Sequence, residues 1–229
     1  MTTPLVEGFF DFACPWSYLA FNRAREAAMR TGSTLEWRPV QGAGIEALLQ
    51  EPNGPLSARQ AAYQQQDLQD WASYCGIKIN RSGGDAGDST AALKGAFLAL
   101  EHGLEKPYML AVFEAYWADG ADISDEDWLV ATAVAAGLDE GGFREWLLKP
   151  AVAEALQRNA AEYVERGGFA TPGFFVAGKF IAGNERMPLV ELALGQASDI
   201  EFVLPGMHGG PEADELVKTK AGQVFREDY

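Results

Sequence analysis

The stretch from Leu5 to Arg30 constrains the fold more than any other part of this chain. Its first part, 5–12, is short, apolar and aromatic, which is typical of a buried strand. Its second part repeats apolar residues at helical spacing and predicts a helix that stops at Thr31-Gly32. Cys14 lies at the junction between the two. Pro15 beside it suits a first helical turn, where no backbone N–H is needed.

Cys14 is the first candidate for chemistry. The unpaired amides and the dipole at a helix N-terminus favour a thiolate over a thiol, so the junction predicts a reactive sulfur. Ser17 lies one helical turn later, where a dithiol enzyme would carry its resolving cysteine. A hydroxyl cannot release a mixed disulfide, so the spacing disfavours a self-sufficient dithiol oxidase and allows monothiol chemistry with a small thiol. The alternative is an inert, buried cysteine.

Composition narrows the class of partner. The chain has 229 residues, 48% of them apolar, and a formal net charge of −15. Such a length allows one domain, or a domain with an insertion. The charge argues against nucleic acids and anionic membranes, because their phosphates would repel it. No apolar run is long enough to cross a bilayer, and the first residues do not resemble a signal peptide.

Two cysteines are too few for a disulfide framework, so we expect a cytoplasmic protein with both thiols reduced. Cys75 falls near the end of a predicted helix, where a small core residue is a better interpretation than a resolving thiol. The two cysteines and two histidines stand far apart in the sequence. They show no metal-ligand spacing, so we expect no metal.

The rest of the chain predicts a second strand at 34–40, a loop over 42–55 with a helical turn at 45–49, and then a long helical region. Ser124 and Asp127 resemble a capping box at the start of one helix. Strand patterns return on either side of an Ala177-Gly178 turn, which predicts a hairpin followed by a last helix. The predicted helices are 58–74, 89–102, 107–117, 125–136, 142–148, 152–165 and 187–194, and the hairpin strands are 173–176 and 179–182.

This order is strand, helix, strand, helical insert, hairpin and helix. It predicts an α/β thioredoxin fold with a large all-helical insertion. The core would comprise 1–56 and 167–197, the insertion 57–166, and a C-terminal tail 198–229. Because two short strands and a hairpin cannot bury their faces alone, core and insertion should fold as one body.

Four blocks stand in order over about residues 5–195. They are Asp11-Phe12-Ala13-Cys14-Pro15-Trp16-Ser17-Tyr18-Leu19; Asn53-Gly54-Pro55 with Arg59, Tyr63 and Asp67; Ala115-Tyr116-Trp117 with Asp122-Ile123-Ser124; and Thr171-Pro172 with Gly183-Asn184-Glu185-Arg186. Together they resemble DsbA-related proteins, and among them the branch that holds 2-hydroxychromene-2-carboxylate isomerases and kappa-class glutathione transferases. Four ordered blocks are more specific than any one alone.

The chain also departs from that branch. Cys14 stands where the branch usually carries serine, and Glu185 stands where it carries aspartate. Gln60, with Arg59 beside it, occupies a position where the branch has lysine. The tail after Gly195 has no counterpart.

The resemblance implies glutathione, or another small thiol, as cofactor. Thr171, before a cis Pro172, would pair with the cysteinyl part of an extended tripeptide; an ordinary trans proline is the alternative. Asn184 would cap the last helix and, with Glu185 and Arg186, bind the γ-glutamyl end. The remaining predicted contacts are Asn53 and Arg59 at the other end of the tripeptide and Trp16 over an aromatic substrate.

Three functions stay open. The first is a glutathione-dependent isomerase acting on an aromatic-derived unsaturated small molecule. The second is a monothiol oxidoreductase using Cys14, or a glutathione transferase. The third is a protein that binds a thiol ligand without turnover. The resemblance also implies a possible homodimer.

Overall fold

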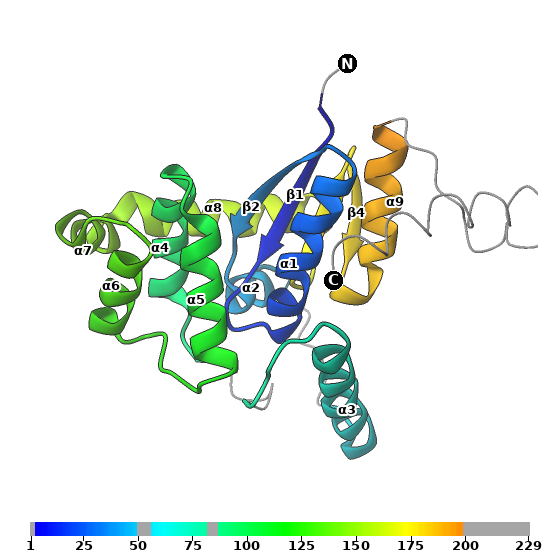
Figure 1. The fold of residues 1–229 in the computed structure, drawn as a ribbon, viewed down its shortest axis with the longest axis horizontal. Helices are drawn as coiled ribbons and strands as arrows, with labels where there is room; N and C mark the ends of the chain where they lie inside the picture. The colour runs from blue at the N-terminus through cyan, green and yellow to red at the C-terminus, as the bar shows by residue number, and fades with distance from the viewer. Residues whose placement is uncertain (1–2, 50–55, 82–86, 199–229) are drawn as a thin grey trace, which may run out of the picture.

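The computed structural model describes residues 3–49, 56–81 and 87–198. Its centre is a four-stranded mixed sheet with the order β2-β1-β3-β4 (Figure 1). β1 (Leu5–Phe10) pairs in parallel with β2 (Thr34–Pro39) and antiparallel with β3 (Gly173–Val176). β4 (Lys179–Ala182) completes the sheet by antiparallel pairing with β3.

Helices cover both faces of the sheet and form a separate group beside it (Figure 1). α1 and α9 pack together on one face, and α8 covers the other. Helices α4 to α7 gather at one end, and α3 projects from the body. The helices are α1 (Pro15–Arg30), α2 (Gly42–Leu49), α3 (Ala58–Tyr74), α4 (Thr90–Glu101), α5 (Glu105–Trp117), α6 (Glu126–Ala135), α7 (Glu140–Leu148), α8 (Pro150–Glu165) and α9 (Met187–Ala197), with a 3-10 turn η1 (Asn184–Arg186) before α9.

The central strand β1 is buried on both faces. Val6 and Phe10 belong to the apolar cluster on the α1 and α9 side, whereas Phe9 belongs to the cluster on the α8 side. Successive side chains of a strand point to opposite faces, so this alternation requires cover on each. On the α8 side, Tyr163 stacks on Phe9 with ring centroids 4.6 Å apart. The apolar run in this strand is therefore nearly continuous because both faces of the sheet are covered by helices.

Core and insertion share one apolar cluster. Phe113 of α5 stacks on Tyr18 of α1 with ring centroids 5.3 Å apart. Trp117 of α5 donates a hydrogen bond from Nε1 to the carbonyl oxygen of Phe12, at 2.9 Å. The cluster runs from Val6 in the sheet to Leu147 in α7, in agreement with the prediction that the parts form one body.

The predicted fold class and element order are confirmed. The Ala177-Gly178 turn has positive φ at both residues, 48° and 80°, as a two-residue hairpin of type I′ requires. The division into domains stays a prediction. The tail from 199 onward lies outside the described residues.

Two local predictions are wrong. α2 begins at Gly42 and not near Ile45, because Gly42 N–H donates to a distant carboxylate oxygen, Oδ2 of Asp11, at 2.7 Å. The N-cap of α6 is Asp125, whose side chain accepts two amide hydrogen bonds. Ser124 instead donates to Oδ1 of Asp122, at 2.7 Å, so no capping box forms there.

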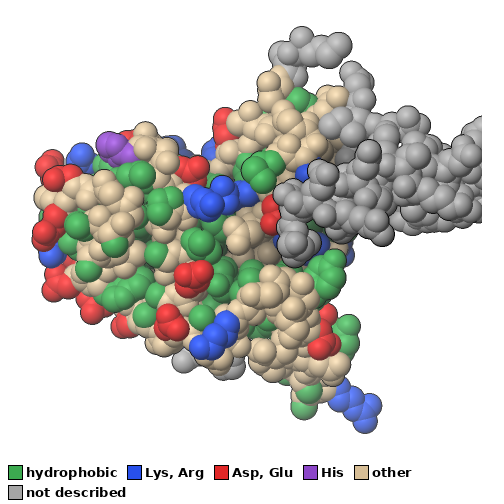
Figure 2. All heavy atoms as spheres, in the orientation of Figure 1, with side chains coloured by type: hydrophobic (Ala, Val, Ile, Leu, Met, Phe, Trp, Pro, Cys, Tyr) green, Lys and Arg blue, Asp and Glu red, His purple; other side chains and the backbone are tan. Residues whose placement is uncertain are grey.

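The surface reflects the acidic composition. Acidic side chains gather over the end of the molecule formed by α6 and α7 (Figure 2). Among the helices of the described residues, none is long and apolar enough to cross a membrane.

Candidate active site

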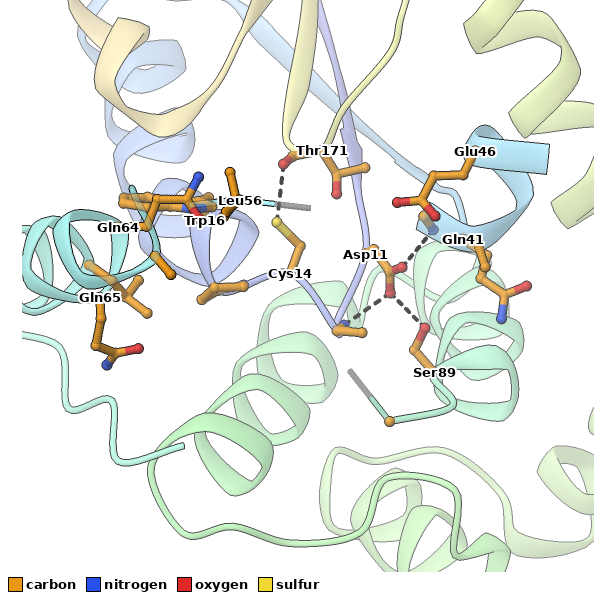
Figure 3. A pocket seen from close by; sticks show the side chains of 17 residues that line it. Asp11, Cys14, Trp16, Gln41, Glu46, Leu56, Gln64, Gln65, Ser89 and Thr171 are labelled. Carbon is orange, nitrogen blue, oxygen red and sulfur yellow. Dashed lines mark hydrogen bonds between the residues drawn. The ribbon is translucent and has the colours of Figure 1, made fainter. Parts of the chain in front are cut away.

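Cys14 occupies the N-cap position of α1, at the end of the short turn that follows β1. Its sulfur lies 3.1 Å from the carbonyl oxygen of Thr171, which belongs to the segment leading into β3 (Figure 3). The Thr171-Pro172 peptide bond is cis, as the resemblance implies. The fold therefore joins two predicted site segments that are 157 residues apart.

The prediction of a thiolate is wrong. Burial raises the pKa of the Cys14 thiol, and its hydrogen bonds with Thr171 and Ser17 only partly oppose that rise. The Cys14 side chain makes no capping hydrogen bond, and the Ser17 and Tyr18 amides donate to the carbonyl oxygen of Cys14 itself. Burial therefore favours the thiol form of Cys14, which donates a hydrogen bond to the carbonyl oxygen of Thr171.

Ser17 lies in the core next to Cys14 and is 1% exposed. Its Oγ accepts a hydrogen bond from the backbone N–H of Asp11, at 3.4 Å. Ser17 lines neither of the cavities around Cys14. The structure places it where it supports the thiol and does not reach a ligand.

Two cavities meet beside Cys14, and Trp16 and Thr171 line both. We call the first, of about 750 Å³, the Asp11 pocket. We call the second, of about 950 Å³ and bordered by β4, the hairpin groove. Both volumes lie in the range of small-molecule sites. α3 contributes a wall to each cavity, with Gln64 facing both.

Asp11 is the most constrained polar residue of the Asp11 pocket, at 4% exposure. Oδ1 accepts from Ser89 Oγ at 2.6 Å and from Ala13 N at 3.0 Å, while Oδ2 accepts from Gly42 N at 2.7 Å (Figure 3). Burial raises the pKa of Asp11, against these three hydrogen bonds, which lower it. The carboxyl group links the starts of α1, α2 and α4.

The remaining walls of the Asp11 pocket combine neutral amides with apolar surface. Figure 3 shows Glu46 reaching from α2 toward the pocket, opposite the α3 residues. The other lining residues that the figure labels are Trp16, Gln41, Leu56, Gln64, Gln65 and Ser89.

The hairpin groove has a different charge pattern. Three basic residues line it, Arg59, Lys179 and Arg186, together with Asp67 and Glu185. The groove therefore brings together five residues that the sequence predicts as ligand contacts: Trp16, Arg59, Thr171, Glu185 and Arg186.

Asn184 is not among the residues that line the groove. It is fully buried, and its Oδ1 accepts a hydrogen bond from Arg23 Nη1, at 2.7 Å. Its predicted role as N-cap is wrong, because η1 intervenes and Arg186 holds that position. Its Nδ2 is the one buried side-chain polar atom of the described residues without a hydrogen-bond partner. Asn53 lies outside the described residues.

Several lining residues escaped sequence reasoning. In the sequence Asp11 stands out only as the first residue of a motif, although a carboxylate directly after a buried apolar strand is itself a signal. Glu46 and Gln41 carry no such signal, since each looks like a surface residue until α2 folds beside Cys14. Within the described residues, no group of three or more His, Cys, Asp or Glu could hold a metal ion.

Two curated relatives carry the same name. The 2-hydroxychromene-2-carboxylate isomerase of Sphingobium xenophagum is 27% identical over 192 residues, covering 82% of this chain and 97% of the relative. The isomerase of that name from Pseudomonas putida is 25% identical over 194 residues, covering 84% and 95%.

Solved structures agree in fold. A selenomethionine structure of a 2-hydroxychromene-2-carboxylate isomerase aligns with a TM-score of 0.71 at 25% identity, covering 84% of this chain and 95% of that one. A probable DsbA oxidoreductase from Streptomyces coelicolor aligns with a TM-score of 0.72 at 25% identity, covering 88% and 92%. A family model described as a DSBA-like thioredoxin domain matches residues 5–195. The chain therefore belongs to the family of DSBA-like thioredoxin domains.

Proposed function

We propose that this protein is a glutathione-dependent enzyme that isomerises an unsaturated, aromatic-derived small molecule, as the name of its relatives implies for them. One observation carries the proposal: the Cys14 sulfur lines the Asp11 pocket and donates a hydrogen bond to the carbonyl oxygen of Thr171, at 3.1 Å, and Thr171 lines both that pocket and the hairpin groove. One cavity suits a charged, extended thiol and the other a second small molecule.

Glutathione would occupy the hairpin groove. It is an extended tripeptide with one ammonium group and two carboxylates, and the groove offers both signs of charge. Glu185 would pair with the ammonium, while Arg59 and Arg186 would meet the carboxylates. The backbone of Thr171 would pair with the cysteinyl residue, as an extended peptide pairs with a strand edge. Its sulfur would then lie beside Cys14.

The chemistry requires no oxidant. A glutathione thiolate adds to one carbon of a conjugated double bond, which leaves a single bond that can rotate. Elimination then restores the double bond with the other geometry and releases the thiolate unchanged. The Cys14 S–H would transfer its hydrogen bond from Thr171 to the glutathione sulfur and stabilise its negative charge. A serine hydroxyl can donate the same bond.

This role predicts how substitutions of Cys14 behave. Cys14→Ser should keep activity within about threefold, since one hydrogen-bond donor replaces another. Cys14→Ala should lose about 10- to 100-fold, because a hydrogen bond to a charged group contributes about 1.5–3 kcal/mol. The measurement is glutathione-dependent isomerisation of a panel of chromene-type acids and unsaturated aryl ketones. Calorimetry with glutathione serves as the binding control, and a protein that neither binds glutathione nor turns over any panel member would refute the proposal.

A monothiol oxidoreductase is the second candidate, and the cysteine at position 14 favours it. In that reaction the Cys14 thiolate attacks a disulfide, forms a mixed disulfide and releases a thiol; glutathione then reduces the mixed disulfide. Cys14→Ser would abolish this activity. The same variant therefore separates the two candidates. A protein that binds without turnover would show weaker binding after Cys14→Ala and no product with any variant.

A further inference from the structure

The two cavities beside Cys14 differ in charge. The hairpin groove contains three basic residues. The Asp11 pocket contains two acidic residues, Asp11 and Glu46, and no Lys, Arg or His among the described residues that line it.

Helix starts do not compensate for this imbalance. The N-terminal ends of α1, α2 and α4 meet near the pocket and would ordinarily favour an anion. At each of these helix starts one amide near the pocket already has a partner within the protein: Gly42 N donates to Asp11, and Thr90 N donates to Asp88 at 2.9 Å. The Ser17 amide donates to the carbonyl oxygen of Cys14, at 3.1 Å. The internal carboxylate of Asp11 takes the place that a ligand anion would need.

The polar groups of the pocket include several acceptors. Asp11 and Glu46 present carboxyl oxygens, and Thr171 presents a carbonyl oxygen. Gln41 donates from Nε2 to Thr90, at 2.9 Å, which leaves its side-chain carbonyl as an acceptor, while Gln64 and Gln65 add amide groups that can donate or accept. A ligand that donates hydrogen bonds is complementary to these acceptors, while a carboxylate would be desolvated beside the acidic Glu46 with no cation among the described lining residues.

The apolar walls of the Asp11 pocket favour a ligand that is mainly apolar. Trp16 offers a large aromatic surface beside Cys14, and Leu56 and Leu68 lie on the α3 side. We infer that the Asp11 pocket takes a flat, mainly apolar small molecule that donates hydrogen bonds and carries no negative charge. The inference rests on the proposed function in that this molecule is the substrate of the glutathione reaction. It separates this chain from relatives whose name specifies a carboxylate substrate.

Three probes that share one ring system and carry a negative, a neutral or a positive side group test the inference. They are 2-hydroxychromene-2-carboxylate, its carboxamide and its (2-aminoethyl)amide. Binding is measured by calorimetry in the presence of S-methylglutathione, which has no free thiol and so prevents turnover. We expect the two amides to bind at least tenfold more tightly than the carboxylate, and this difference to shrink at high salt.

Charge reversal at the rim provides the matched variant. Glu46 is exposed and makes no side-chain hydrogen bond or ion pair, so Glu46→Lys should fold normally. The variant should improve carboxylate binding about tenfold and weaken binding of the cationic amide by a similar factor. Glu101→Lys, at the exposed end of α4, changes the net charge equally and should leave all three affinities unchanged.

The outcomes distinguish this inference from the proposed function. If glutathione binds and the carboxylate binds as tightly as the amides, the inference is wrong and the proposed function stands. If glutathione binds and no probe does, the inference is also wrong. If the amides are preferred but glutathione does not bind, the pocket has the inferred selectivity and the proposed function fails.

Discussion

At the scale of single residues, packing decides the charge state that a motif only suggests. A cysteine before a helix predicts a thiolate, but in the structure Cys14 is partly buried and its sulfur donates to Thr171. Burial raises the pKa of the Cys14 thiol by more than the hydrogen bonds with Thr171 and Ser17 lower it. Asp11 follows the same rule: burial raises its pKa although three donors surround it.

The free energy of unfolding should depend on pH, because burial raises the pKa of Asp11. Folding raises the pKa of Asp11 above its value in the unfolded chain. The resulting stability is complete in acid, below about pH 4, and is lost as pH rises through the folded-state pKa. The free energy of unfolding of the wild type, minus that of Asp11→Asn, should therefore fall as pH rises. Urea unfolding of both proteins from pH 3 to pH 8 measures this difference, and one that grows with pH would contradict the assignment.

At the scale of secondary-structure elements, α3 lines both cavities but buries few of its own side chains against the rest of the molecule. Only Leu68 and Ala72 are buried among its 17 residues. Arg23 of α1 adds a cation–π contact to Trp71 at 4.9 Å, and it also donates to the Asn184 carbonyl oxygen at 2.8 Å. One arginine thus connects α1, α3 and the turn before α9.

Removing Arg23 should loosen this connection. Arg23→Ala leaves the buried Asn184 without its donor and Trp71 without its cation, so we expect the free energy of unfolding to fall by about 2 kcal/mol. Glutathione affinity should also weaken, because α3 lines the hairpin groove. Arg25→Ala is the control on the same helix, where the guanidinium only lies over Phe21. Equal effects of the two substitutions in urea unfolding and calorimetry would contradict this account of α3.

At the scale of the whole molecule, the sequence predicts what depends on local pattern. Strand and helix periodicity, the Ala177-Gly178 turn and the Pro15 helix start all led to the correct element order. What it missed depends on distant partners. The start of α2 needs Asp11, 31 residues away, and the raised pKa of Cys14 comes from burial, which the sequence around Cys14 does not reveal.

The same limit applies to the site. Residues such as Arg59, Glu185 and Arg186 could be predicted because the family resemblance implies which end of the glutathione tripeptide each would contact, and all three line the hairpin groove. The acidic character of the Asp11 pocket could not be predicted from the sequence, because Glu46 looks there like an ordinary surface residue. Only the folded chain places its carboxylate opposite α3 (Figure 3).

Intact-mass analysis after incubation with oxidised glutathione tests most directly whether the fold presents a reachable, protonated Cys14 sulfur to a thiol tripeptide. In that exchange the Cys14 sulfur bonds to one glutathione and the other leaves as a thiol. We predict a single adduct on Cys14, absent from Cys14→Ser, whose rate of formation keeps rising into alkaline pH because burial raises the thiol pKa. An adduct on Cys75 alone, no adduct, or a rate already at its maximum below neutral pH would contradict the account.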